Sequence, residues 1–495
     1  MRRLVRSTAL LGVGSAATIV AAIVRAKILA ALLGPQGTGV IAQLSTLTAV
    51  LVPLATLGMG NGVVAMIAEA RSRGNLLLVR RIHSTALTLS LLVGVALAIL
   101  AALASPWLAD AIYHDRAWTW VVLIGVVTVP LSAIASLRIS MLQGHEAVRA
   151  MAGVNAIIAA VGIAALVPLA WLFGLKGAVA QLLVVAVAYV LVTGRLLRPH
   201  APPAPESDSA GTPPPRIDRS LLRPLWRYGS SALMVGLSST LTLLVLRSVL
   251  VSKLGLAQNG IYQVCVGISG LYMPLILTSI TAVIWPQIAA QREDEETRKT
   301  MRDGVRLAFL LMTAATGAML AGAPVWIPLL YSSKFLPALD LLPIQFLGDY
   351  FRTAAWMFGI WLVPKNWLRP WVLFDIVYGV VTIAVFWFLV DRIGLKSVVV
   401  AYVAAHISHA ALHYFLARRS LGFRLGPDNR RLLLASFALL LCLAVWTPRN
   451  PLGAGLGSVA LLAWAGLVVR PDEWRALVRR VRYLGSAAAG RPDLG

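Results

Sequence analysis

Long apolar runs, separated by short polar segments, fill most of this chain. Each run continues for about 20 residues or more, whereas the strands of a membrane barrel would alternate apolar and polar residues over short distances. The pattern predicts an all-α polytopic membrane protein with about 14 transmembrane helices. The predicted spans are 7–33, 38–68, 84–108, 117–141, 151–173, 177–197, 226–252, 259–290, 304–330, 341–363, 369–390, 395–417, 431–447 and 452–470.

The composition agrees with this pattern. Of the 495 residues, 59% are hydrophobic and only 13% are charged, about half the charged share of a soluble protein. These values exclude a soluble enzyme. The two cysteines, Cys265 and Cys442, lie in apolar runs, so a secreted disulfide scaffold is excluded and no metal-type cysteine spacing exists. The sequence contains no phosphate-binding loop and no HExxH motif, and it predicts no cofactor.

The net charge of +24 follows from membrane topology rather than from a nucleic-acid partner. With 14 spans and the N-terminus inside, 33 lysines and arginines fall in inside segments and 7 in outside segments. Both termini are therefore predicted to be cytoplasmic. Arg2, Arg3 and Arg6 precede an apolar run that continues past Arg25 to Leu33, which favours a first span over a removed signal peptide.

One segment does not fit a membrane. Residues 198–224 hold eight prolines, which predicts a semi-extended cytoplasmic linker. It separates an N-lobe of six spans (1–197) from a C-lobe of six spans (225–420). Residues 421–495 add two spans and a basic cytoplasmic tail, whose segment 474–484 fits either an interfacial helix on anionic lipid or an ordinary positive-inside tail.

The two halves resemble each other when the second is laid on the first in a single register. This register aligns Arg6 with Arg227, Gly34 with Gly255, Gly39 with Gly260, Pro53 with Pro274, Arg71 with Arg292 and Arg81 with Arg302. Because six spans is an even number, both halves enter the membrane from the same side. The sequence therefore predicts parallel repeats around a central cavity.

Charges inside spans are the most informative residues, because each costs several kcal/mol unless it is paired or hydrated. Arg25 and Arg247 occupy near-equivalent places in the two halves. They fit either a pair of cavity arginines that hold an anion such as a diphosphate, or side chains that reach the outer headgroups. Lys27 is two residues from Arg25 and so points to nearly the opposite helix face, but it is also a candidate for binding the substrate.

Asp349 and Arg352 are spaced i, i+3 and can pair on one helix. The pair is either structural or part of a cavity network that a substrate or proton can break. Asp375 stands alone in the next span. It is a candidate member of that network or a residue that couples a proton or cation to transport.

A stripe of polar rings follows one helix face. Tyr402, His406, His409 and His413 are spaced i, i+4, i+7 and i+11. No nearby acid or cysteine completes a zinc site, so no metal site is predicted. The histidines are candidates for a polar lining of the cavity or for a titratable role in ion coupling.

Two stretches carry a resemblance to a known family. The sequence ALLGPQGTGVIAQLSTLTAVLVPLATLGMGNGVV (30–64) looks like the first hairpin of Wzx-like O-antigen flippases. The stretch 332–375 resembles lipid III flippases of the enterobacterial common antigen type, through its SxKF motif, its QxxGD core and the basic residue after it. The resemblance covers about residues 5–420 and lies within the multidrug/oligosaccharidyl-lipid/polysaccharide exporter superfamily.

This resemblance implies a transporter, not an enzyme, in the bacterial inner membrane. Its cargo would be an undecaprenyl-diphosphate-linked oligosaccharide, moved from the cytoplasmic to the periplasmic leaflet by alternating access for surface polysaccharide synthesis. Candidate partners are membrane lipids, a polysaccharide polymerase and a chain-length regulator. Arg25 and Arg247 match first-helix arginines of related lipid flippases, and Asp349 and Arg352 match the GDxxR/K stretch.

The sequence departs from this family in three features: the two extra spans, the Pro-rich linker and the histidine stripe. The extra spans are similar to those of lipid II flippases, where such helices are linked with a groove for the lipid tail. A lipid II flippase and a multidrug cation antiporter therefore stay open as alternatives. Spans 1–6 offer almost no acidic residues for binding a cation, and the short outside loops argue against a membrane enzyme.

Overall fold

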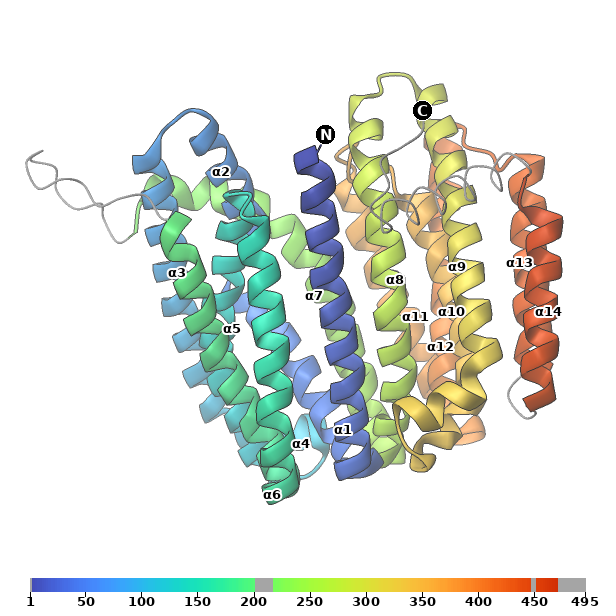
Figure 1. The fold of residues 1–495 in the computed structure, drawn as a ribbon, viewed down its shortest axis with the longest axis horizontal. Coiled ribbons are helices and arrows are strands. Elements are labelled where there is room, and N and C mark those ends of the chain that lie inside the picture. Colours follow the sequence, from blue (N-terminus) through green and yellow to red (C-terminus); the bar gives the residue numbers. More distant parts are fainter. Residues whose placement is uncertain (1, 201–216, 447–450, 471–495) are drawn as a thin grey trace, which may run out of the picture. The chain divides into compact units, whose positions relative to one another are not determined.

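The computed structural model describes residues 2–200, 217–446 and 451–470, and these ranges are helical without a β-strand (Figure 1). The expected all-α architecture is confirmed. The predicted amphipathic segment 474–484 and most of the predicted linker lie outside the described residues. The helices are α1 (Arg2–Ala55), α2 (Gly60–Ser72), α3 (Leu76–Leu103), α4 (Ser105–Tyr113), α5 (Thr119–Gly144), α6 (Val148–Leu197), α7 (Arg219–Leu254), α8 (Leu256–Ala290), α9 (Asp294–Leu330), α10 (Leu342–Gly359), α11 (Leu368–Ile393), α12 (Lys396–Leu421), α13 (Pro427–Trp446) and α14 (Pro451–Val468).

Nine helices in the described ranges are long and apolar enough to cross a membrane. Two of them, Thr18–Ala55 and Val148–His200, have 38 and 53 residues, far more than the 20 or so that one crossing needs. Each bends at a glycine with positive φ, 64° at Gly34 and 56° at Gly174, so each covers two predicted spans. The helices α10, α13 and α14 are not among the nine, and the number fourteen stays a prediction.

The predicted span 38–68 differs from the structure, because a turn interrupts it. Helix α1 ends at Ala55 and α2 begins at Gly60. Between them Leu57 and Gly58 have φ of 50° and 66°, a left-handed conformation that stops a helix. The N–H of Gly58 donates to the carbonyl of Pro53, which satisfies one of the carbonyls left open at the end of α1.

The predicted repeat is visible in the backbone. Residues with positive φ recur at matching places in the two halves, and the pairs are Gly34 and Gly255, Glu146 and Asn366, and Gly174 and Gly394. The first pair keeps the register of the sequence alignment, and the other two are displaced from it by a single position. The ψ angles agree as well, at −131° for Gly174 and −135° for Gly394. Both of these glycines begin the tripeptide Gly-Leu-Lys, so sequence and conformation support the same parallel repeat.

The helices α1 and α8 touch backbone to backbone at two repeat-equivalent glycines. A Cβ atom added to Gly39 would lie 2.0 Å from the carbonyl oxygen of Leu256, and one added to Gly260 would lie 1.9 Å from that of Pro35. Pro35 and Leu256 are themselves equivalent in the repeat alignment, so each half presents the same surface to the other. Only glycine permits this approach, as at other close helix contacts in membranes.

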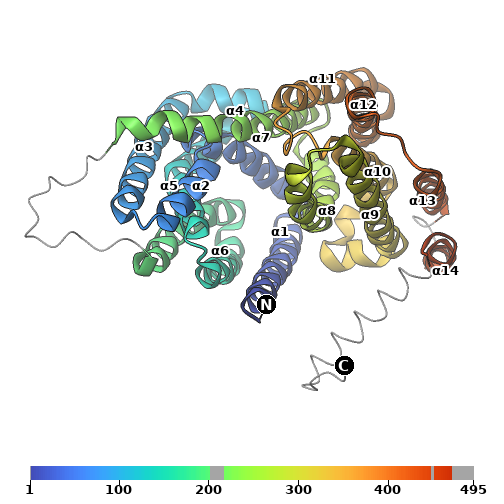
Figure 2. The same ribbon diagram turned by 90° about the horizontal axis from the view of Figure 1, so that it is seen from above.

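Contacts divide the described residues into two compact units. The first holds α1 to α7, α8 up to Leu271, residues Trp326–Leu341, and α11 with α12 up to His409. In this unit α5 and α6 pack side by side and α11 packs along α7 (Figure 2). The second unit holds the rest of α8, most of α9, α10, the end of α12, α13 and α14. These boundaries differ from the predicted lobes 1–197 and 225–420, and the division into lobes stays a prediction.

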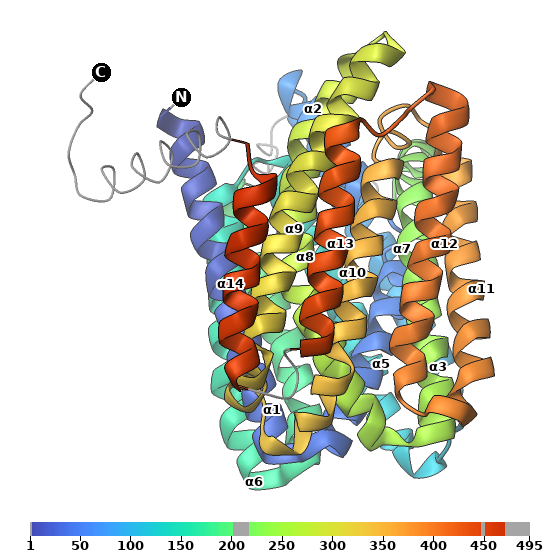
Figure 3. The same cartoon turned by 90° about the vertical axis from the view of Figure 1, so that its right-hand side faces the viewer.

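The two extra C-terminal helices are built into the second unit. Helix α13 packs on α10 (Figure 3). There the Tyr350 hydroxyl donates a hydrogen bond of 2.9 Å to the Leu433 carbonyl. Helix α14 packs beside α13, and its Leu461 side chain lies against Gly317 of α9. The predicted spans 431–447 and 452–470 therefore correspond to an integral part of this unit.

The described ends of the predicted linker 198–224 contact the His145 ring after α5 and the Thr85 hydroxyl of α3. Next to its start, the His200 ring lies 6.2 Å from the His145 ring, which in turn places Nε2 3.2 Å from Nε2 of His83 on α3. At its end, the Asp218 N–H donates to the Thr85 hydroxyl at 2.9 Å. The Asp218 carboxylate also caps α7 by accepting from the Ser220 N–H, which explains why α7 begins inside the predicted linker.

We expect Gly260→Ala to destabilise the protein and Gly270→Ala, in the same helix, to leave it unchanged or slightly more stable. The first substitution places a methyl group on a backbone carbonyl, which costs about 2–3 kcal/mol, whereas the second meets no atom within 4 Å. Thermal unfolding of the two purified variants in one detergent measures the difference. Equal midpoints for both would contradict the backbone contact.

A second prediction concerns pH. Burial and the nearby Arg71 and His200 lower the pKa of His145 to about 4, against 6.5 for a free histidine. The unfolded chain therefore binds a proton below pH 6.5 that the folded chain rejects, so the free energy of unfolding falls as the pH drops from 6.5 towards 4.

Replacing His145 with glutamine should reduce this loss of stability at low pH. The measurement is the unfolding midpoint of the purified protein at several pH values between neutrality and the lowered pKa. The matched control is His114→Gln, at an exposed histidine after α4, which should keep the parental pH dependence. A His145→Gln variant with the parental slope would disprove the assignment.

Candidate functional site

Arg247 is a fully buried cation near the end of α7. Only 1% of its surface is exposed. Its guanidinium donates to two amide oxygens on α8, at 2.9 Å to Asn259 Oδ1 and 2.5 Å to Gln263 Oε1. Asn259 and Gln263 are spaced i, i+4 and so share one face of α8. The guanidinium also lies 5.5 Å from the centre of the Tyr262 ring.

The partners of Arg247 are neutral. Among the described residues no carboxylate lies within ion-pair distance of its guanidinium, and its Nε has no hydrogen-bond partner. A buried charge that lacks an opposite charge is costly, and amide oxygens compensate only part of that cost. The site can therefore accept an anion more readily than an already paired arginine could.

Asn259 extends this contact to α1. Its Nδ2 donates a hydrogen bond of 3.0 Å to the carbonyl of Gly39, at the point where α1 and α8 meet through their glycines. Both hydrogen bonds of Asn259 are buried. One amide side chain thus connects the cation of α7 to the backbone of α1.

Arg25 and Lys27, two residues apart on α1, have different environments. Arg25 is half-buried and forms no hydrogen bond or ion pair with the residues that the structure describes. Lys27 Nζ donates to the carbonyls of Pro328 and Tyr331, at 3.1 and 2.6 Å, where α9 ends. Lys27 therefore satisfies the carbonyls at a helix C-terminus, a place that favours cations.

Asp375 belongs to a polar cluster between α11 and α12. Its carboxylate lies 3.6 Å from Nε2 of His409 and accepts a hydrogen bond from the Trp371 side chain. The ring of Tyr378, on α11, lies 4.6 Å from that of His406 and 5.7 Å from that of His409. The structure thus joins Asp375 to part of the histidine stripe, which the sequence treated as separate.

The stripe itself is divided. The rings of Tyr402 and His406 lie 4.4 Å apart within this cluster, whereas His413 belongs to the second unit and packs against Gly359 of α10. In that unit the fully buried Asp349 accepts a hydrogen bond from the hydroxyl of Tyr272 on α8. Arg352 is half-buried on the same helix. The predicted Asp349–Arg352 pair stays a prediction.

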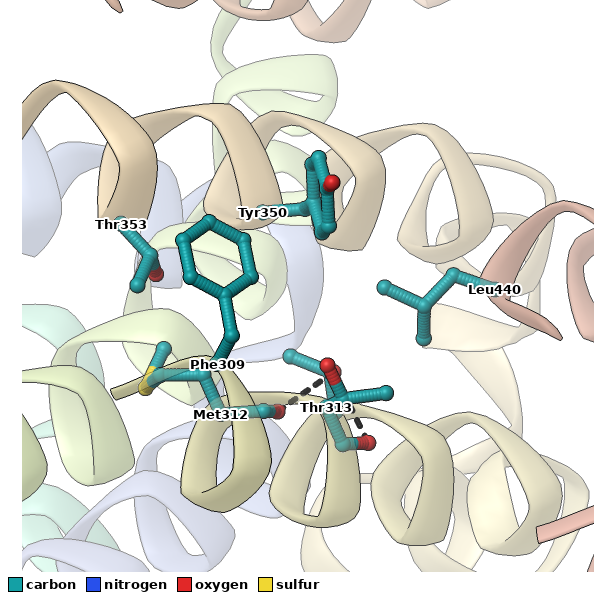
Figure 4. A pocket seen from close by; sticks show the side chains of 7 residues that line it. Phe309, Met312, Thr313, Tyr350, Thr353 and Leu440 are labelled. Carbon is teal, nitrogen blue, oxygen red and sulfur yellow. Dashed lines mark hydrogen bonds between the residues drawn. The ribbon is translucent and has the colours of Figure 1, made fainter. Parts of the chain in front are cut away.

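A small pocket lies in the second unit between α9, α10 and α13. Its empty volume is about 170 Å³, and it is lined by Phe309, Met312, Thr313, Thr316, Tyr350, Thr353 and Leu440 (Figure 4). The hydroxyls of Thr316 and Thr353 donate to carbonyls of their own helices, so they are not directed at a ligand. Pockets for small ligands commonly start at about 300 Å³, which makes this one too small for a sugar chain.

Reasoning from sequence found the charges but missed their neutral partners. Asn259, Gln263 and Tyr378 lie in apolar runs and carry no charge that would mark them as costly in a membrane. Asn259 could have been noticed from its position beside the repeat glycine Gly260. In the described part of the chain, no group of three His, Cys, Asp or Glu residues is arranged to hold a metal ion.

Comparison with known proteins agrees with this architecture. Residues 28–340 match the family model described as "Polysaccharide biosynthesis protein". The chain is 24% identical over 392 residues to the lipid III flippases of Escherichia coli and Shigella flexneri, an alignment that covers 78% of this chain and 91% of each flippase.

Solved structures show the same fold. A multidrug resistance MATE transporter of the MOP superfamily, in an inward-facing conformation, aligns with a TM-score of 0.70 and 16% identity over 82% of this chain and 94% of its own. A MOP superfamily transporter from Pyrococcus furiosus aligns with a TM-score of 0.63 and 16% identity over 84% and 95%.

These relatives are transporters and flippases, not enzymes, as the sequence predicted. The protein is thus a multi-pass membrane protein with the fold of MOP superfamily transporters. The family match spans more than half of its length, and the chain belongs to the polysaccharide biosynthesis protein family.

Proposed function

We propose that this protein moves an undecaprenyl-diphosphate-linked oligosaccharide from the cytoplasmic to the periplasmic leaflet of the bacterial inner membrane by alternating access. The observation that carries the proposal is the buried, carboxylate-free cation Arg247. The names of the flippase relatives support the same cargo class, a lipid-linked sugar. The product would serve surface polysaccharide synthesis, where a polymerase and a chain-length regulator would act on it.

The chemistry of the cargo matches the site. A diphosphate carries negative charge that is expensive to bring into an apolar environment. A guanidinium offers several N–H donors in one plane and binds phosphate oxygens two at a time. The lipid tail can stay in the bilayer while the head group passes, so the protein needs to neutralise only the diphosphate and to accommodate the sugar.

Arg25 is the second cation in this proposal. It lies on α1, is half-buried and forms no hydrogen bond or ion pair with the described residues, so its donors are available to an anion. Lys27 has a different role here, because the α9 carbonyls already occupy its ammonium group. Whether the sugar is an O-antigen unit, a related oligosaccharide or the head group of lipid II depends on contacts beyond these cations.

The multidrug cation antiporter is the less favoured alternative. An antiporter that exports cations needs acidic residues along its binding path, and the sequences of α1, α3, α5 and α6 contain no aspartate or glutamate. The acidic residues of 1–197 lie outside these four helices, Glu69 in α2, Asp110 in α4, and Asp115 and Glu146 in turns. The charge pattern therefore favours an anionic cargo.

The energy source in this proposal is an ion that binds at the Asp375 cluster. Asp375 is buried, and it lies close to His409 and Trp371. A carboxylate beside an imidazole can hold a proton or a small cation and release it when the helices move. This role is separate from binding the diphosphate and can be tested separately.

Alanine in place of either Arg25 or Arg247 should reduce transport roughly a hundredfold. The reason is the loss of charged hydrogen bonds worth about 1.5–3 kcal/mol each. Lysine should restore part of the activity, because it keeps the charge without the planar fork. The measurement is surface polysaccharide, together with accumulated lipid-linked intermediate, in bacteria that lack their own oligosaccharide flippase.

The matched control is Arg392→Ala, at an exposed arginine near the end of α11, which should transport at the parental rate. Membrane levels of each variant are compared by immunoblot. Parental transport by both the Arg25→Ala and the Arg247→Ala variant would reject the diphosphate site. If the parent restores no polymer despite good expression, lipid II and drug-resistance assays decide between the alternatives.

Replacing Asp375 with asparagine should abolish the response of transport to an ion gradient while leaving binding of undecaprenyl diphosphate unchanged. The substitution keeps the size and polarity of the side chain but removes its charge. Transport into proteoliposomes is measured with an imposed proton or sodium gradient and after an ionophore has collapsed it. A variant that still responds to the gradient would exclude Asp375 as the coupling residue.

A further inference from the structure

Asn259 on α8 forms two hydrogen bonds, one to a side chain of α7 and one to the backbone of α1. Its Oδ1 accepts from the guanidinium of Arg247, and its Nδ2 donates to the carbonyl of Gly39. A cationic donor polarises the amide, and a polarised amide is a stronger donor on its other side. The strength of the bond to α1 therefore depends on what Arg247 is bound to.

This hydrogen bond lies beside the contact between α1 and α8, and at the two repeat-equivalent glycines that contact involves only backbone atoms. Gly39 and Gly260 bring α1 and α8 together without any side chain between them. The repeat counterpart of Asn259 is Thr38, which likewise precedes the contact glycine of its helix. The Thr38 hydroxyl has no hydrogen-bond partner among the described residues. The two glycines are equivalent in the repeat, but only the helix next to Arg247 adds a side-chain hydrogen bond to the contact, from Asn259 to the Gly39 carbonyl.

We infer that Asn259 is a positioning residue that couples the occupation of Arg247 by an anion to the opening of the contact between α1 and α8. This inference rests on the proposed function, since the anion is the diphosphate of the cargo. A diphosphate oxygen is a stronger acceptor for a guanidinium than a neutral amide oxygen. Once it takes the N–H donors of Arg247, Asn259 loses its cationic partner and its bond to Gly39 weakens.

The position of the contact between α1 and α8 suits a role in opening the outer end of the transport path. Gly39 and Gly260 lie at span ends that the distribution of lysines and arginines predicts to be outside. A contact that loosens there only when the cargo has arrived would open the outer end of the path to a loaded protein. An empty protein would keep the contact closed.

The test uses a cysteine reporter at Thr38, which is buried at the contact. In the full-length protein Cys265 and Cys442 are replaced by alanine, Thr38→Cys is introduced, and the protein is placed in nanodiscs. The rate of labelling by a soluble maleimide is measured with and without undecaprenyl diphosphate. Binding of the same lipid is measured separately by its retention on the detergent-purified protein, because an empty nanodisc bilayer would itself retain a lipid. A Gln36→Cys reporter, at an exposed position, controls for the maleimide itself.

We expect undecaprenyl diphosphate to raise the labelling rate at Thr38→Cys about tenfold, the factor that corresponds to one net hydrogen bond, and to leave Gln36→Cys unchanged. Asn259→Asp keeps an acceptor for Arg247 but has no N–H for Gly39. Asn259→Leu removes both bonds and serves as the second variant if the first fails to fold. Either variant should be labelled rapidly without the lipid.

The matched control is Gln263→Leu, one turn further along α8. It removes the other amide that binds Arg247, whereas the bond from Asn259 to Gly39 remains. Labelling in this variant should still depend on the lipid. The coupling is disproved if the parent binds the lipid without a change in labelling, or if the Asn259 variants behave like Gln263→Leu. A parent that does not retain the lipid at all would instead refute the proposed function.

Discussion

The buried Arg247, which has no carboxylate partner among the described residues, constrains how α7, α8 and α1 pack. A guanidinium in an apolar span must find oxygen atoms, and the described residues supply neutral ones, from Asn259 and Gln263. To do so α8 must lie against α7, and because Asn259 also binds the backbone of α1, the first helix is held there as well. The hydrogen bonds that stabilise this one charge thus join three helices, α7, α8 and α1.

The fold could be predicted from the sequence wherever a physical constraint restricts the type of residue. Gly34, Gly255, Gly174 and Gly394 mark bends because other residues rarely adopt positive φ, and the apolar runs follow the helices. The turn after Ala55 was missed because the apolar run continues through it, although Gly58 beside Leu57 carries such a mark. The number of spans could not be settled, since one apolar run can hold a bent helix or two.

The candidate site was predictable only in its charged members. Arg247 and Asp375 stand out in an apolar chain, but their partners depend on which helices become neighbours, and no spacing along one helix reveals that. The histidine stripe illustrates the limit. Its period places His409 and His413 on one face, yet one lies beside Asp375 and the other packs on Gly359, because different neighbours cover different heights of α12.

The small difference in register between the two arginines has a geometric consequence. The repeat aligns Arg25 with Leu246, the residue directly before Arg247, and each step along a helix turns it by about 100°. The two halves share a backbone pattern, but their cations do not share its symmetry. If one anionic cargo met both arginines, as proposed, it would encounter two unlike environments, and a molecule with two different ends would be held in one orientation rather than the reverse. The direction in which the cargo lies would then follow from an offset of a single position.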